Sequence, residues 1–265
     1  MKSILLHVHT DDGQEARFQS ALDVARLMNA HITCIQVMPY GAYVGEPFTG
    51  VVMADEAYQQ AMEATREKVE ADLANEGVSW DWVDRRGGGA AAILAQSMLA
   101  DLIVLSRPGR ALDPAGNMPI VGEIAVRSSA PALIVSDQQQ GFDGEAPALI
   151  AWNGKPEAAN AIKRALPLIA RSKAVHVVSI GEDGDALPAS DAASYMSRHG
   201  LKVETHGRAR GKGSVADAIL SVAGETRAGY LVMGAYGRSR LAEFLLGGVT
   251  RAMLDKAEIP LVLAH

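Results

Sequence analysis

A glycine-rich segment near the end of the chain has the residue types and spacing that suit a phosphate-binding loop. Residues 230–233, Tyr-Leu-Val-Met, have the length and apolar character of a buried strand. Gly234 and Gly237 follow directly, and a Gly247-Gly248 pair comes later, at the start of a predicted helix. Glycines let phosphate oxygens approach the backbone, and the unpaired N–H groups at a helix start carry partial positive charge. The pattern therefore predicts an anion or nucleotide site.

The same glycines also have a purely structural interpretation. A glycine at the end of a strand permits a tight turn and a close contact between a helix and that strand. Because such spacings also occur where no ligand binds, both interpretations stand at this point.

The order Gly-x2-Gly-x9-Gly, formed by Gly234, Gly237 and Gly247, resembles the nucleotide loop of the universal stress protein family. The resemblance implies binding of ATP or a related adenine nucleotide, accompanied by Mg²⁺. It also implies that the nucleotide lies along the loop, beside the turn after residues 148–152 and near the end of the next strand. The site residues implied in this way are Asn153, Gly154, Ile180, Met233, Gly234, Gly237, Gly247, Gly248, Val249 and Thr250.

Two positions depart from the family pattern. Gly248 stands where the family has Ser or Thr, whose hydroxyl contacts the phosphates in ATP-binding members. Asn153 stands where the family has an Asp near the nucleoside, and an amide cannot supply negative charge. The backbone cradle remains, but we expect weaker ATP binding than in members that keep the hydroxyl.

An internal repeat indicates how the chain is organised. Residues 100–109 align with residues 228–237, and residues 131–135 align with residues 260–264. A repeat of this size indicates duplication, and apolar strands that alternate with helices indicate parallel sheets covered on both faces. We therefore predict an α/β fold of two tandem Rossmann-like domains, each a five-stranded parallel sheet with helices on both faces. The family resemblance implies the same architecture, of the adenine nucleotide alpha hydrolase-like type.

The domain boundaries follow from the polar, glycine-containing segment between the repeats. We predict a first domain at residues 1–137, a linker at residues 138–146 and a second domain at residues 147–265. The matching last strands of the two halves are edge strands that need cover, so we expect them to pair about a pseudo-twofold axis within the chain. This intrachain pair is compatible with a homodimer. The predicted strands are residues 4–8, 31–37, 79–83, 102–105, 132–135, 148–152, 174–180, 201–205, 230–233 and 261–264.

The first half departs from the glycine pattern at the loop. Ser106 aligns with Gly234, and only Gly109 keeps its place. Pro114 and Pro119 follow, and proline removes backbone donors that a phosphate cradle needs. We therefore expect at most one nucleotide per chain, in the second half.

Composition excludes several classes of protein. The net charge of −6 disfavours a nucleic-acid partner, because phosphate-binding surfaces need an excess of Lys and Arg. A single cysteine, Cys34, allows no intrachain disulfide, fits a reducing compartment and is predicted to be buried and inert. We find neither a signal-peptide core nor an apolar run near the roughly 20 residues of a membrane span. These features predict a soluble cytoplasmic protein without a membrane partner.

The catalytic and metal-binding motifs that we sought are not in the sequence. It has no Gly-x-Ser-x-Gly elbow, no Gly-x4-Gly-Lys-Ser/Thr loop and no Cys or His pair at zinc spacing. His176 and His199 look isolated, and a Gly211-x-Gly213 motif lies after the wrong strand for a dinucleotide fingerprint, although the helix start behind it suits an anion. We assign no catalytic residue and no metal ligand.

The resemblance implies a cytoplasmic regulatory or binding module of the stress response, with weak ATP hydrolysis at most. Two alternatives remain open from the sequence. One is an interaction protein without a ligand, which the departures at Gly248 and Asn153 favour. The other is a nucleotide-dependent adenylating or hydrolysing enzyme of a related fold, although the pyrophosphate loops of such enzymes are missing.

Overall fold

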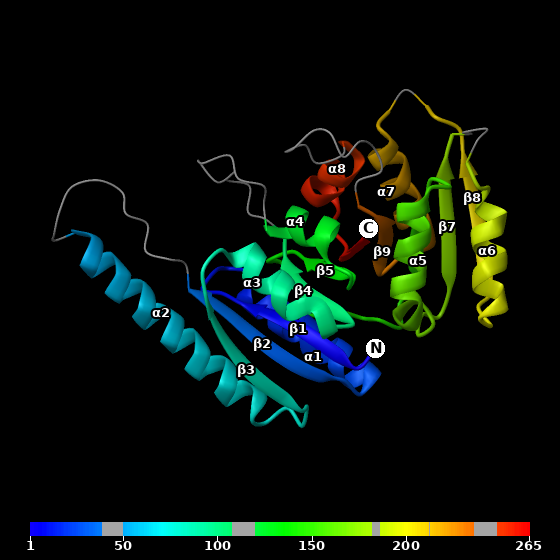
Figure 1. Ribbon diagram of the computed structural model, residues 1–265. Coiled ribbons are helices and arrows are strands. Elements are labelled where there is room, and N and C mark those ends of the chain that lie inside the picture. The colour runs from blue at the N-terminus through cyan, green and yellow to red at the C-terminus, as the bar shows by residue number, and fades with distance from the viewer. Residues whose placement is uncertain (39–49, 108–119, 182–185, 212, 236–247) are drawn as a thin grey trace.

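The computed structural model describes residues 1–38, 50–107, 120–181, 186–211, 213–235 and 248–265. Within these residues ten strands form one sheet, in the order β3-β2-β1-β4-β5-β10-β9-β6-β7-β8. The two halves of the chain lie side by side along this sheet, the first half coloured blue to green and the second green to red in Figure 1. The strands are β1 Ser3–Val8, β2 His31–Met38, β3 Trp80–Arg86, β4 Leu102–Ser106, β5 Ala132–Val135, β6 Ala148–Trp152, β7 Val175–Ile180, β8 Val203–Arg208, β9 Tyr230–Gly234 and β10 Leu261–Ala264.

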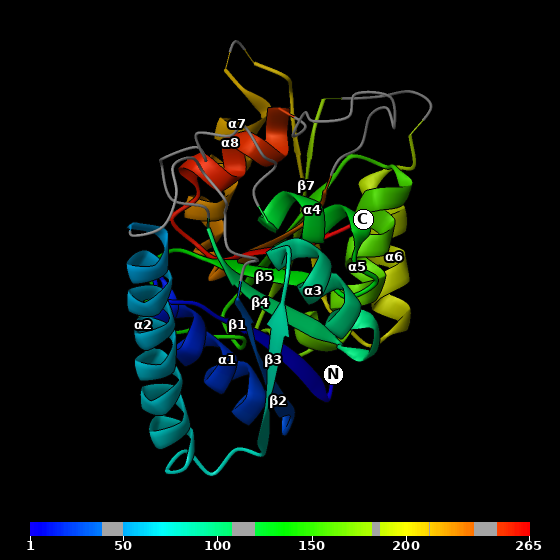
Figure 2. The ribbon, with the colours of Figure 1, turned by 60° about the vertical axis from the view of Figure 1, so that its left-hand side comes forward.

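Helices cover both faces of the sheet, and each face has its own apolar core. Residues of α1, α2, α5 and α6 pack on one face, and residues of α3, α4, α7 and α8 pack on the other. The turned view in Figure 2 shows α7 and α8 next to each other, away from α1 and α2. The helices are α1 Gln14–Met28, α2 Gly50–Leu73, α3 Gly89–Gln96 with a 3-10 turn at Ser97–Leu99, α4 Ile120–Arg127, α5 Pro156–Ile169, α6 Ala189–Arg198, α7 Val215–Thr226 and α8 Gly248–Lys256.

Not one helix in the described part of the chain combines the length and the apolar character that crossing a membrane requires.

Each half has the same strand order, which confirms the predicted fold class. Counted from its outer edge, the first half reads β3-β2-β1-β4-β5 and the second reads β8-β7-β6-β9-β10. Neighbouring strands within each half are parallel. The last strands β5 and β10 pair antiparallel, with Leu133 opposite Val262. This pairing covers two strands that would otherwise be edges, and it joins the two parallel sheets into one.

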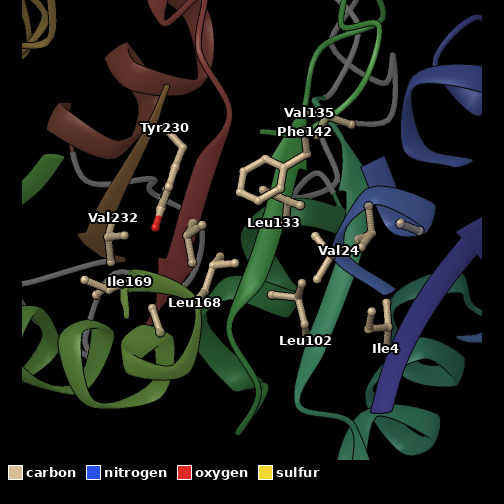
Figure 3. Packing of buried hydrophobic residues seen from close by; sticks show 14 of the residues in the cluster. Ile4, Val24, Leu102, Leu133, Val135, Phe142, Leu168, Ile169, Tyr230 and Val232 are labelled. Carbon is tan, nitrogen blue, oxygen red and sulfur yellow. The ribbon is translucent and has the colours of Figure 1, made fainter. Parts of the chain in front are cut away.

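The segment between the halves packs more tightly than its composition predicts. Phe142 is only 5% exposed, and its ring centroid lies 5.3 Å from that of Tyr230. Its backbone N–H donates to the Asp23 carboxylate at 2.8 Å. Figure 3 shows Phe142 among core residues of both halves, between Leu133 and Tyr230. Phe142 therefore anchors the segment 138–146 to the core, which the polar composition of that segment does not predict.

Candidate functional site

The strand order of the second half reverses between β6 and β9. From β6 the chain continues to β7 and β8 on one side, and β9 and β10 lie on the other side. Ligands of open α/β sheets bind at the carboxyl ends of the strands beside such a reversal. Ala151 near the end of β6 pairs with Met233 near the end of β9. The turn after β6, with Asn153 and Gly154, and the end of β9, with Met233 and Gly234, therefore flank the reversal.

The turn after β6 is built from Asn153, Gly154 and Lys155. Gly154 has a φ of +70°, and a Cβ there would lie 2.6 Å from the carbonyl oxygen of Leu187. Both observations require glycine. The Asn153 side chain accepts from the Lys155 N–H at 3.1 Å and donates to the Glu157 carboxylate at 3.1 Å. Asn153 therefore shapes the turn and holds a buried carboxylate at the start of α5.

Gly234 ends β9 and packs against α5. A Cβ at this position would lie 2.7 Å from the carbonyl carbon of Glu157 and 2.8 Å from the nitrogen of Ala158. The close helix–strand contact alone explains why glycine stands here. Of the two interpretations of the glycine pattern, the structural one accounts for Gly234, whereas Gly237 and Gly247 lie outside the described residues.

Helix α8 begins at Gly248 and presents the N–H groups of its first turn. Gly248 is exposed, its φ is not positive, and a Cβ there would meet no atom of the described residues within 4 Å. The first turn carries no acidic side chain. Val249 is half-buried and Thr250 is buried, whereas Gly248 is exposed. A helix start of this kind favours an anion.

Helix α7 starts differently, because its own residues occupy its N-terminus. The hydroxyl of Ser214 accepts from the backbone N–H of Asp217 at 3.1 Å. The Asp217 carboxylate also pairs with Lys256 of α8 at 2.7 Å. These capping bonds supply the negative charge that an anion would bring, so we place no phosphate at α7.

A hollow of about 270 Å³ opens between the ends of β7 and β8 and the start of α7. Ile180, the residue expected near the adenine, lines it. Arg208 of this hollow pairs with Glu225 at 2.5 Å, whereas the exposed Arg210 makes no ion pair with any residue in the described part of the chain. The hollow thus combines an apolar wall with one cation that is available to a ligand. Its lining residues include Ile180, Arg208, Arg210, Gly211, Gly213 and Ser214.

In the first half the corresponding reversal, between β1 and β4, is closed by an arginine. Arg17 of α1 is 1% exposed. Its guanidinium donates to the Ser106 hydroxyl at 2.6 Å and to the His7 carbonyl at 2.9 Å, and it pairs with Asp11 at 2.9 Å. Further bonds reach the carbonyl of His9 and the side chain of Gln14. The strand ends that would face a ligand are therefore tied together by the protein itself.

This arrangement explains the departure at Ser106. The Ser106 hydroxyl also donates to the Gly13 carbonyl at 3.2 Å. A Cβ at Gly13 would lie only 2.3 Å from the hydroxyl oxygen of Ser106, so glycine is required there. Ser106 therefore bridges β4 and the start of α1, where the second half has a direct contact of Gly234 with α5. Pro114 and Pro119, the other predicted departures, lie outside the described residues.

His7 should make the stability of the first half sensitive to acid. Burial, together with the positive charge of Arg17, lowers the pKa of His7 to about 3, from 6.5 in an unfolded chain. As pH falls from 6.5 toward 3, the unfolded chain binds a proton that the folded chain does not. Stability is therefore lost over this window, by about 1.4 kcal/mol per pH unit for one such group.

The variant His7→Gln removes the titrating group, so its unfolding free energy should fall less steeply between pH 6.5 and pH 4.5. Urea unfolding of both proteins at several pH values measures the difference in slope. Parallel pH profiles for wild type and His7→Gln would contradict the assignment to His7.

Asp11 contributes to the pH dependence of stability at lower pH. Burial opposes ionisation of its carboxyl, but the hydrogen bond with His9 and the charge of Arg17 lower the pKa of Asp11 to about 2. The stabilisation by Asp11 is present above about pH 4 and is lost as pH falls toward 2.

Three features of these sites were not predicted from the sequence. Arg17 and Glu157 lie on helices whose apolar residues predict one buried face. The apolar pattern does not indicate that a charged residue is buried together with that face. The description of His176 as isolated is wrong, because its Nδ1 lies 3.1 Å from Nε2 of His206 on the neighbouring strand. The alternation of residues along both strands is the signal that could have revealed this pair. Cys34 is buried as predicted, and burial raises the pKa of its thiol to about 12.

Comparisons with known proteins found a family match for the second half of the chain. Residues 147–265 match the sequence model of the universal stress protein family. All ten predicted site residues lie inside the matched segment, and Arg17 lies outside it.

Solved structures resemble the whole chain. A universal stress protein from Archaeoglobus fulgidus is 17% identical, with a TM-score of 0.73, and the match covers 99% of this chain and 97% of that one. A protein of unknown function from Pseudomonas aeruginosa is 16% identical, with a TM-score of 0.64, and the match covers 100% and 92% of the two chains. At these identities the likeness shows the fold. No curated protein matched the chain by sequence.

Proposed function

We propose that the second half binds one adenine nucleotide, ATP or a close relative with its Mg²⁺, at the reversal between β6 and β9. The observation that carries the proposal is the start of α8, where Gly248 is exposed and the first turn has no acidic side chain. The contrast with α7, whose start is capped by its own Ser214, favours α8 for the phosphates. The hollow at Ile180 supplies an apolar wall for the base.

Each group has a role in this proposal. The N–H groups of Gly248, Val249 and Thr250 would hold phosphate oxygens, together with the glycine loop that leads into α8. Asn153 keeps the Glu157 carboxylate fixed at the nucleoside end, so that the negative charge missing at position 153 stands one helical turn further along. Bound Mg²⁺ would neutralise phosphate charge. None of the described side chains is assigned a catalytic role, and weak hydrolysis is the most that we propose.

The biological role that we propose is a cytoplasmic regulatory or binding module of the stress response. The two halves, residues 1–137 and 147–265, would act as an internal pair of domains about a pseudo-twofold axis. The closed first half would support the second half, and the whole chain is compatible with a homodimer.

A second candidate function is an interaction protein without a ligand. One observation favours it: Gly234 and Asn153 are both fully explained by packing and turn geometry. In that case the glycine loop would serve the fold alone.

Isothermal titration of the whole protein with ATP and Mg²⁺ tests the proposal. We expect one molecule bound per chain, because Arg17 closes the first half. Two equivalent sites per chain would contradict the closed first half, and no binding at millimolar ATP would favour the interaction protein.

A further inference from the structure

Three side chains that can bind metals meet on the outer strands of the second half, away from the proposed nucleotide site. His176 of β7 pairs in register with Glu204 of β8, and His206 follows Glu204 on the same face of the sheet. His176 Nδ1 lies 3.1 Å from His206 Nε2 and 3.4 Å from Glu204 Oε2. All three potential ligand atoms lie within 4.8 Å of one another.

We propose that His176, Glu204 and His206 form a binding site for a divalent transition-metal ion of the Zn²⁺ type. Bonds of about 2.0–2.1 Å in a tetrahedral site place neighbouring ligand atoms about 3.3 Å apart. The two distances from His176 Nδ1 already match this spacing. The carboxylate of Glu204 completes the triangle by a side-chain rotation, which its exposure of 76% allows.

The ligand set determines which ions fit. Imidazole nitrogens suit Zn²⁺, Co²⁺, Ni²⁺ and Cu²⁺, whereas Mg²⁺ and Ca²⁺ prefer oxygen ligands. Three protein ligands leave a fourth position for water, as in open zinc sites. His176 is 9% exposed, so the site has a buried inner ligand and an exposed outer one, and the ion enters from the solvent at the edge of the sheet.

The first half provides an internal comparison. Counted outward from the aligned strands β4 and β9, the positions of His176, Glu204 and His206 correspond to Thr33, Asp81 and Val83. The first half therefore has no histidine at the positions that correspond to His176 and His206. Since the first half forms the same two strands without them, the strands do not need these histidines to pair.

A hydrogen bond between the two histidines is the alternative to a metal site. At 3.1 Å one of the two ring nitrogens carries a proton that the other accepts. A metal ion replaces that proton, because both nitrogens must be deprotonated to coordinate it. The two arrangements therefore differ in whether the protein binds Zn²⁺, which titration with the metal measures directly.

The test is titration of tag-free, nucleotide-free protein with Zn²⁺, followed by titration with Co²⁺, whose visible absorption reports tetrahedral coordination. We expect one Zn²⁺ per chain and no comparable binding of Mg²⁺. His206→Val introduces the residue that the first half carries at this position, and it should weaken Zn²⁺ binding at least about tenfold. Glu204→Gln changes an exposed side chain, so it tests the site even if His206→Val fails to fold.

His31→Ala is the matched control. His31 lies 3.4 Å from Asp81 on the corresponding strands of the first half, where it has no second imidazole beside it. This variant should bind Zn²⁺ as the wild type does. Unchanged Zn²⁺ affinity in both His206→Val and Glu204→Gln, or absence of a tetrahedral Co²⁺ spectrum in the wild type, would overturn the proposal. A loss of binding in His31→Ala would overturn it as well.

Discussion

Replacing Arg17 by methionine should lower the free energy of unfolding by about 3 kcal/mol, which is the order expected when one partner of a buried ion pair is removed. The guanidinium joins the ends of β1 and β4 through the His7 carbonyl and the Ser106 hydroxyl, and it balances the charge of Asp11. Methionine fills much of the volume but satisfies none of these groups. A buried acceptor that loses its donor costs about 1–3 kcal/mol.

Urea unfolding of Arg17→Met and wild type measures this difference. Arg26→Met is the matched control on the same helix, because Arg26 is half exposed and pairs with Asp23 and Glu76 at the surface. Exposed ion pairs contribute about 0–1 kcal/mol, so this control should change stability little. Arg17→Lys keeps the charge but not the fork of donors, and we expect an intermediate loss. Equal losses in Arg17→Met and Arg26→Met would mean that Arg17 does not close the first half.

The fold could be read from the sequence because it depends on patterns that a linear chain displays. The apolar runs that became β4 and β9, residues 102–105 and 230–233, are buried on both faces and so lack polar residues. The repeat between the halves then predicted the same architecture for both, and the structure gives both halves the same strand order. Strand β3 continues to Arg86, three residues beyond its predicted end, because it pairs with β2 as far as Met38. The last residues of this edge strand are polar, so the apolar pattern of the sequence does not predict that the strand extends to them.

The chemistry of the sites was harder to predict, because it depends on residues that meet only in three dimensions. Arg17 reads as part of a helix, and only the fold brings it to Ser106, 89 positions away in the sequence. His176 and His206 come from different strands, so they do not form a short sequence motif that would predict their contact. Gly234 shows the opposite problem. Its place in the glycine pattern suggests a ligand, yet the contact with α5 alone requires a residue without a Cβ.

Gly248→Ser should strengthen ATP binding roughly tenfold to a hundredfold. A hydrogen bond to a charged group contributes about 1.5–3 kcal/mol, and each 1.4 kcal/mol is about tenfold in affinity. Neither backbone strain nor a steric conflict with the described residues opposes the substitution. The φ of Gly248 is not positive, so serine meets no backbone strain, and a Cβ there has no neighbour within 4 Å among the described residues. The added hydroxyl therefore stands at the open start of α8, free to bind a phosphate oxygen.

Gly248→Ala is the control, because it adds the Cβ without the hydroxyl. Titration of wild type and both variants with ATP, at one fixed concentration of Mg²⁺, compares the three affinities. We expect the serine variant to bind most tightly and the alanine variant to bind about as the wild type does. A gain shared by serine and alanine would assign the effect to a stiffer helix start and not to the hydroxyl. Identical affinities in all three proteins would place the phosphates away from α8, and the interaction protein would then be the better account of this chain.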